Sequence, residues 1–150
     1  MKLVKDKEIL VGADFAGYPL KEAVCEHLRA KGWKITDVGV KADSDPDDTD
    51  LMFHRVGLRA GAMISEGEFE RALLFCGTGM GIHIAASKCP HVHAGVVESV
   101  PAALRAITGN GVNVLAMDEL DAFDYEEYKA NGFKLKHLGD YDLKLEKKPE

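Results

Sequence analysis

The chain has 150 residues, with 19 basic and 25 acidic side chains and a formal net charge of −6. That length suits one compact domain, and the acidic balance without a basic block argues against nucleic-acid binding. No apolar run reaches the ~20 residues of a membrane-spanning helix, and the charged start Met1–Glu8 does not resemble a signal peptide. Three cysteines without zinc spacing indicate a reducing cytoplasm and no metal site.

The first half of the chain alternates apolar stretches with amphipathic ones. Leu20, Val24 and Leu28 recur on one helical face, and Gly32 follows as a stop signal. The predicted elements are a strand over Glu8–Asp14, a helix over Tyr18–Lys31, a strand over Trp33–Val38, an acidic loop over Lys41–Asp50 and a helix over Phe53–Ser65.

The second half continues this alternation. Its predicted elements are a strand over Ala72–Cys76, a glycine-rich turn, an Ala-rich helix towards Lys88, a strand over Val92–Val97, a helix over Ser99–Ile107 capped by Ser99, a turn over Thr108–Gly111 and a strand over Val112–Met117. Strands and helices at this spacing predict an α/β fold, with a five-stranded parallel sheet covered by helices on both faces. We expect a single domain over 1–150, in which about 118–150 forms a C-terminal arm.

The central turn is the strongest functional signal. Cys76 ends an apolar strand and is followed by Gly-Thr-Gly-Met-Gly81, where backbone N–H groups can approach an anion or oxyanion. In open α/β sheets, ligands bind at the carboxyl ends of strands. A thiol at this position can act as a base or a nucleophile. The alternative is a small buried hydrophobic residue that closes the strand.

Three segments resemble the family of ribose-5-phosphate isomerase B and the galactose-6-phosphate isomerase subunits. They are Gly12-Ala-Asp14-Phe-Ala-Gly17-Tyr-Pro-Leu-Lys21, Cys76-Gly-Thr-Gly-Met-Gly81 with Ala-Ala-Ser-Lys88 behind it, and Asn110-Gly-Val-Asn113-Val-Leu-Ala116. The resemblance implies a Rossmann-like three-layer sandwich in which two chains share each active site. It also implies aldose–ketose isomerisation through a cis-enediolate, without a metal or a cofactor.

The same resemblance assigns roles to individual residues. Cys76 would be the base, and Asp14 would orient substrate hydroxyls beside Phe15 in the pocket wall. Asn110 would bind substrate. The enediolate oxygen would be held by Thr78 and by the backbone of Gly77, Gly79, Met80 and Gly81. Two structural alternatives stay open, because Thr78 and Asp14 are also residue types that cap a helix or a turn.

Several residues depart from the family pattern. Phe15 replaces a histidine that contacts substrate, Gly109 replaces the ring-opening histidine, and Leu120 replaces a phosphate-binding arginine. The C-terminal basic element of the family has no counterpart; Lys134-Leu-Lys-His137 is the nearest group. A phosphate dianion usually recruits several charge-assisted donors, so we expect a substrate with little or no phosphate.

Three functions follow from these observations. The first is a cofactor-free isomerase of a sugar or sugar acid with little or no phosphate. The second is an isomerase of a phosphorylated pentose or hexose in which a partner chain supplies the missing groups. The third is a non-catalytic sugar-binding subunit, which the retained Cys76 turn argues against. We expect at least a homodimer, or a homotetramer, because the set of site residues in one chain is incomplete.

Overall fold

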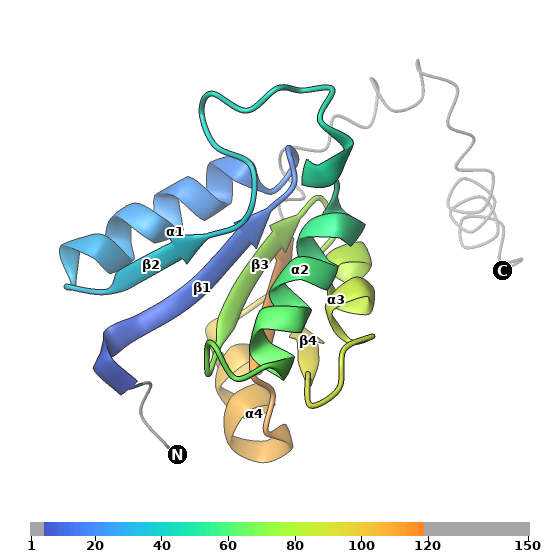
Figure 1. Cartoon of the computed structure of the whole chain (residues 1–150). Helices are drawn as coiled ribbons and strands as arrows, with labels where there is room; N and C mark the ends of the chain where they lie inside the picture. The colour runs from blue at the N-terminus through green and yellow to red at the C-terminus, as the bar shows by residue number, and fades with distance from the viewer. Residues whose placement is uncertain (1–4, 119–150) are drawn as a thin grey trace, which may run out of the picture. The chain divides into compact units, whose positions relative to one another are not determined.

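The core of the molecule is one parallel sheet with the strand order β2-β1-β3-β5-β4 (Figure 1). The computed structural model describes residues 5–118, which belong to one compact unit. The strands are β1 (Glu8–Ala13), β2 (Lys34–Asp37), β3 (Ala72–Cys76), β4 (Ala94–Val96) and β5 (Val114–Asp118). The predicted α/β fold with a five-stranded parallel sheet is therefore confirmed. The predicted C-terminal arm, apart from Asp118, lies outside the described residues.

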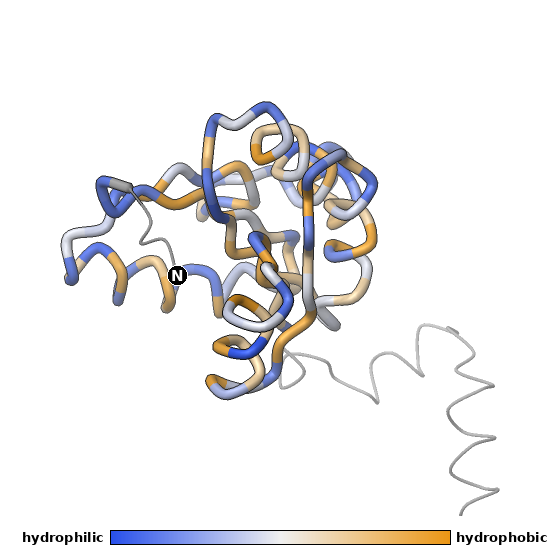
Figure 2. Tube along the Cα trace, turned by 90° about the horizontal axis from the view of Figure 1, so that it is seen from below, coloured by the Kyte–Doolittle hydropathy of each residue, from blue (hydrophilic) through white to orange (hydrophobic). Residues whose placement is uncertain are grey.

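Helices cover both faces of this sheet. They are α1 (Tyr18–Ala30), α2 (Phe53–Ser65), α3 (Met80–Ala86) and α4 (Val100–Asn110), with 3-10 turns η1 (Lys5–Lys7) and η2 (Thr49–Leu51). Successive residues of β1 point to opposite sides, so Ile9 and Val11 pack with Cys25 of α1, whereas Leu10 joins the core beneath α2 and α3. Figure 2 shows hydrophobic residues alternating with hydrophilic ones along the helical coils. The three-layer arrangement matches the expectation.

The helix boundaries follow local chemistry, with one correction. The Ser99 hydroxyl accepts from the Ala102 N–H at 3.3 Å, as the predicted cap requires. The turn predicted at Thr108–Gly111 is wrong, because α4 continues to Asn110. The Thr108 hydroxyl bonds back to the Leu104 carbonyl at 2.8 Å, and only Gly111, with φ of 66°, ends the helix.

The strand ends also differ by a few residues from the prediction. The fourth strand is only Ala94–Val96, since the chain before it turns with the Val92 N–H bonded to the Cys89 carbonyl. The fifth strand begins later and extends to Asp118. This extension matters for the site, because it carries an aspartate to the carboxyl edge of the sheet.

Candidate active site

Two strand-to-helix turns meet at the carboxyl edge of the sheet, one after β1 and one after β3. β1 and β3 pair with Ala13 opposite Phe75, and the Asp14 N–H continues the ladder to the Phe75 carbonyl at 3.3 Å. Gly17 lies directly on the next peptide, because a Cβ there would be 2.3 Å from the Phe75 carbonyl carbon and 2.6 Å from the Cys76 nitrogen. The glycine therefore lets the first turn reach the residue that ends β3.

The glycine-rich turn after β3 uses a backbone conformation that favours glycine. Gly79 adopts φ of 67°, a left-handed conformation that favours glycine, and α3 begins at the next residue, Met80. The Thr78 hydroxyl accepts from the Met80 N–H at 3.3 Å, so the capping alternative for this residue describes the observed contact. The ring of Phe53 packs over Gly81, where a Cβ would lie 2.6 Å from the ring.

Cys76 lies between two aspartates on the neighbouring strands. It is 4% exposed and ends β3, with Asp14 beside it after β1 and Asp118 opposite it in the register of β5. Adjacent strands are about 4.8 Å apart, so the backbone of both aspartates lies next to the backbone of Cys76. Asp118 was not identified from the sequence. The sequence could have indicated this residue only if the last strand had been extended by one position, from Met117 to Asp118.

The Asp14 carboxylate is both hydrogen-bonded to backbone and partly buried. It accepts the Gly17 N–H at 2.9 Å, which closes the first turn and agrees with the turn-capping alternative. Burial raises the pKa of the Asp14 carboxyl above its ordinary value, and the backbone N–H groups of Gly17 and Ala16 partly offset this effect. The side chain is only half-buried, so its second oxygen can serve a substrate hydroxyl.

The structure does not bring all predicted site residues together. Asp14, Phe15, Cys76 and the turn from Gly77 to Gly81 share the carboxyl edge; Phe15 is 38% and Met80 is 55% exposed there. Asn110 ends α4, four residues before β5 begins, and β5 runs parallel to β3. Asn110 is therefore at the amino edge of the sheet, and Cys76 of the same chain is at the opposite, carboxyl edge.

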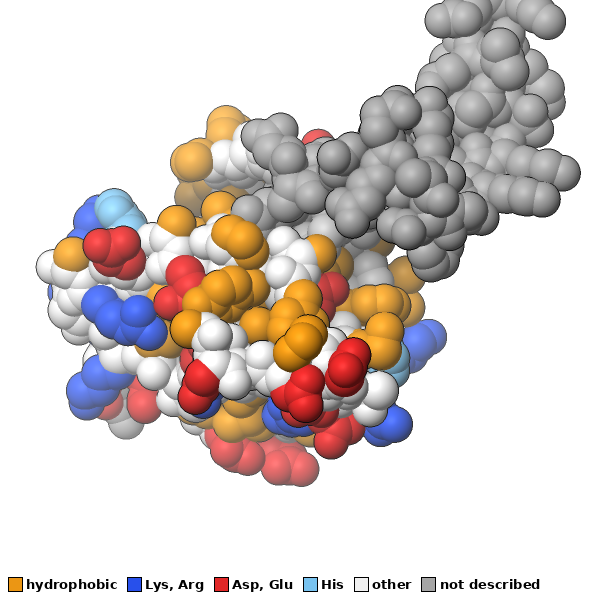
Figure 3. Space-filling model, turned by 90° about the horizontal axis from the view of Figure 1, so that it is seen from above, with side chains coloured by type: hydrophobic (Ala, Val, Ile, Leu, Met, Phe, Trp, Pro, Cys, Tyr) orange, Lys and Arg blue, Asp and Glu red, His pale blue; other side chains and the backbone are white. Residues whose placement is uncertain are grey.

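Two basic groups near the carboxyl edge are bound to the protein itself. The Arg59 guanidinium donates to the carbonyls of Val38 and Asp50 at 3.0 and 3.4 Å, and Lys21 is enclosed by acceptors. Figure 3, which looks down on this edge, shows acidic side chains along one margin beside a hydrophobic group. Two hollows of about 340 and 390 Å³, one between α1 and α4 and one at the amino edge, are not lined by Cys76.

Several other predicted features can be checked in the described part of the chain. All three cysteines are free thiols, and burial raises the pKa of Cys25, which lies on α1 and packs against β1. Residues 5–118 contain no cluster of three metal-binding side chains and no helix long and apolar enough to cross a bilayer. His83 is the fourth residue of α3, and its buried Nδ1 has no partner among these residues.

Comparison with known proteins agrees with this geometry. Residues 9–128 match the model of the family described as Ribose/Galactose Isomerase. The chain is 41% identical to the 4-deoxy-4-sulfo-D-erythrose isomerase of Clostridium sp. (strain MSTE9), over 73% of this chain and 67% of that protein. It is 37% identical to D-erythrulose-4-phosphate isomerase 2 of Mycolicibacterium smegmatis, over 75% and 72%.

The fold is likewise similar to solved structures. Ribose-5-phosphate isomerase B of Clostridium thermocellum superposes with a TM-score of 0.67 at 31% identity, covering 75% of this chain and 72% of that one. The relatives are sugar isomerases, and the structural neighbour has the same Rossmann-like sheet. The chain is an aldose–ketose isomerase that belongs to the ribose/galactose isomerase family.

Proposed function

We propose that Cys76 is the base of an isomerisation that proceeds through a cis-enediolate. The observation that carries this proposal is the position of its thiol, at the strand end between Asp14 and the glycine-rich turn. Moving a proton between adjacent carbons requires one base beside the acidified C–H bond and donors for the oxygen that gains charge. No other cysteine is at this edge, since Cys25 is on α1 and Cys89 lies beyond the end of α3.

The steps follow from these groups. The Cys76 thiolate removes the proton from the carbon next to the carbonyl, and the electron pair moves to form the enediolate. The thiol then returns the proton to the former carbonyl carbon, while a hydroxyl proton transfers between the two oxygens. Asp14 accepts a hydrogen bond from a substrate hydroxyl, and backbone N–H groups between Gly77 and Gly81 donate to the enediolate oxygen.

The substrate we propose is a four-carbon sugar with a terminal acid group other than phosphate, a sulfonate being the first candidate. The relative with 41% identity is named for a sulfonated tetrose, and two further relatives are named for a tetrulose phosphate. In the described residues, Arg59 and Lys21 at the carboxyl edge are held by protein acceptors. A monoanionic sulfonate makes a smaller demand for cationic donors than a phosphate dianion does.

A second copy of the chain completes the site in this proposal. Asn110 is at the amino edge, so it can reach a glycine-rich turn only in another molecule. A two-fold homodimer, or a homotetramer built from it, supplies Asn110 to the partner's Cys76. The free cysteines fit a cytoplasmic location for this assembly.

The second candidate is an isomerase of a sugar phosphate, supported by the two relatives that are named for D-erythrulose 4-phosphate. Steady-state kinetics on 4-deoxy-4-sulfo-erythrose, erythrose 4-phosphate, ribose 5-phosphate and free erythrose separates the candidates. We expect the highest kcat/KM for the sulfonate and a value at least about tenfold lower for either phosphate ester, the equivalent of one weak charge-assisted bond. Equal or better turnover of a phosphate ester contradicts the proposed substrate.

A further inference from the structure

Lys21 is a fully buried lysine that the reaction described above does not use. It lies in the first turn of α1, its side chain is 0% exposed, and it is among the largest buried side chains of the described residues. Lysine is almost never fully buried without a partner, because removing its charge from water costs several kcal/mol. Its environment therefore needs a structural or functional explanation.

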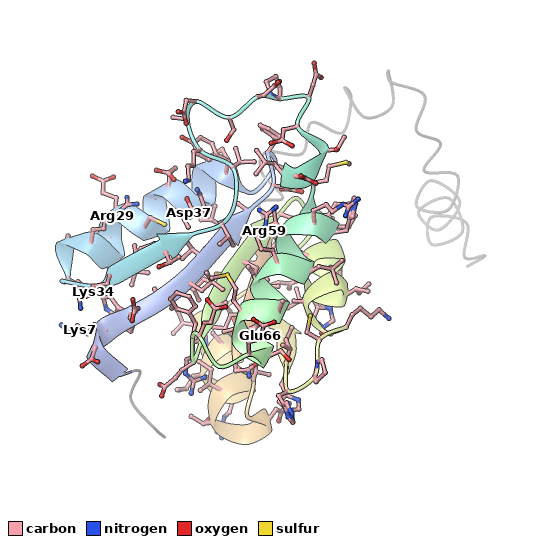
Figure 4. All side chains as sticks on the ribbon, in the orientation of Figure 1. Lys7, Arg29, Lys34, Asp37, Arg59 and Glu66 are labelled. Carbon is pink, nitrogen blue, oxygen red and sulfur yellow. The ribbon has the colours of Figure 1, made fainter. Side chains whose placement is uncertain are left out.

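The ammonium group has a complete set of acceptors. It contacts the Asp37 carboxylate, the Val40 carbonyl at 2.5 Å and the Glu22 carboxylate at 3.0 Å, and it lies 5.2 Å from the centre of the Tyr18 ring. Figure 4 shows Asp37 at the end of β2 next to α1. With no exposed surface and three protein acceptors, Lys21 has no capacity to bind a substrate anion directly.

On one side, these contacts hold the turn after β2 against the end of β1. Asp37 accepts the Gly39 N–H at 2.9 Å through its second oxygen. Gly39 lies on Ala13 so closely that a Cβ would be 2.1 Å from the Ala13 nitrogen, and the Val40 N–H bonds to the Ala13 carbonyl at 2.9 Å. Ala13 is the residue immediately before Asp14.

On the other side, the backbone of Lys21 leads to Asp14 by a second route. The Lys21 N–H donates to the Gly17 carbonyl at 3.0 Å, and the Gly17 N–H donates to the Asp14 carboxylate at 2.9 Å. Gly17 in turn lies on the peptide between Phe75 and Cys76. Both routes from Lys21 therefore end at Asp14, which is placed beside Cys76.

We propose that Lys21 is a positioning residue, which sets the Asp14 carboxylate relative to Cys76 by fixing the turn after β2 and the turn after β1 together. This inference rests on the roles proposed for Asp14 and Cys76. A carboxylate that is displaced by about 1 Å from a reacting group can cost about 100-fold in rate. A loss of Lys21 should therefore appear in kcat and not only in stability.

The test is a double-mutant cycle with Lys21→Met and Asp14→Asn, measured on the full chain with the substrate that it turns over best. Lys34→Met, at the exposed far end of β2 in Figure 4, is the matched control. Folding is monitored by circular dichroism and thermal unfolding, and kcat is divided by the concentration of folded chains. These measurements give kcat per intact site. If the role of Lys21 is purely structural, Lys21→Met leaves this value unchanged.

We expect Lys21→Met to lower kcat per site by about 10- to 100-fold in the wild-type background and by less than about threefold in the Asp14→Asn background. Lys34→Met should retain wild-type kcat. Equal fold losses in both backgrounds, or a wild-type kcat in Lys21→Met, overturn the proposal. If Lys21→Met does not fold, Asp37→Asn replaces it, because its amide oxygen can still accept the Gly39 N–H while the ion pair is lost.

Failure of this proposal is distinguishable from failure of the proposed function. If Cys76→Ala retains near-wild-type turnover, the base has been assigned wrongly, and the positioning role of Lys21, which is defined relative to Cys76, is overturned with it. If Cys76→Ala is inactive and the two effects in the cycle multiply independently, only the positioning role of Lys21 is overturned.

Discussion

The two edges of the sheet both carry polar residues but use them differently. At the amino edge, Arg71 donates to the Val112 carbonyl at 2.9 Å, and the Asn113 amide bridges the His91 carbonyl and the His93 N–H at 2.9 Å each. These side chains hold loops together. At the carboxyl edge, Asp14 and Thr78 also bond to backbone, but the Cys76 thiol beside them makes no hydrogen bond to any residue within 5–118.

This difference indicates where chemistry can take place. A group whose bonds all serve the backbone cannot change its protonation or partner without a cost in stability. The Cys76 thiol makes no such bond among the described residues, and it lies directly before the glycine-rich turn, so its partner can be a substrate. Asn110, at the amino edge, enters the chemistry only if the two edges of different copies meet.

The largest effect should follow removal of the thiol. Cys76→Ala is expected to lower kcat/KM by about 10²–10⁴-fold, the usual contribution of general base catalysis, and to cost only about 1 kcal/mol in unfolding free energy. Cys25→Ala and Cys89→Ala are the matched controls and should stay active. Solvent deuterium should appear next to the carbonyl carbon with the wild type and not with Cys76→Ala. Near-wild-type turnover by this variant would exclude the thiol as base.

A mixing experiment tests whether the two edges meet between copies. Cys76→Ala and Asn110→Ala should each have low activity alone. After unfolding and refolding together at equal concentration, about a quarter of the sites should regain both residues if the assembly is a two-fold dimer. Activity that stays at the sum of the two separate variants would show that Asn110 serves no neighbouring site. Sedimentation of the wild type provides the oligomeric state for the calculation.

Two glycines differ in how closely other atoms approach them, and an alanine substitution at each measures the effect of that difference on stability. Gly17→Ala places a methyl group 2.3 Å from the β3 backbone, so we expect a loss of about 3 kcal/mol in stability and of most activity. Gly109→Ala, in α4, meets nothing within 4 Å and should gain about 0.5–1 kcal/mol through helix propensity. Chemical denaturation measures both. A Gly17→Ala protein as stable as the wild type would contradict the close approach of the first turn.

Asp14→Asn separates the two roles of that carboxyl group. Because burial raises the folded-state pKa of Asp14, its contribution to stability is present at low pH and is lost as pH rises through that pKa. The amide avoids this loss, so the variant should melt at a higher temperature than the wild type at pH 7. The difference should vanish below about pH 4, near the unfolded-state value. Its kcat/KM should fall about 10- to 100-fold.

Most of the elements and the strand–turn–helix form of the central segment could be predicted from local patterns. The helix Phe53–Ser65 and the strand Ala72–Cys76 have the predicted limits, since their apolar spacing and flanking residues agree with each other. The end of α4 could not, because Thr108 and Gly109 are turn residues by composition and become helical when Thr108 bonds to Leu104. Boundaries of this kind depend on which competing hydrogen bond forms.

The sequence by itself determined the alternation of strands and helices, the position of Cys76 at a strand end and the resemblance to sugar isomerases. These features depend on residues close together in the chain. Only the tertiary structure decided that Asp118 pairs with Cys76, that Asn110 lies at the opposite edge and that Lys21 is enclosed by Asp37 and Val40. Each of these depends on strand register and on which loops meet, and spacing along one chain does not specify either.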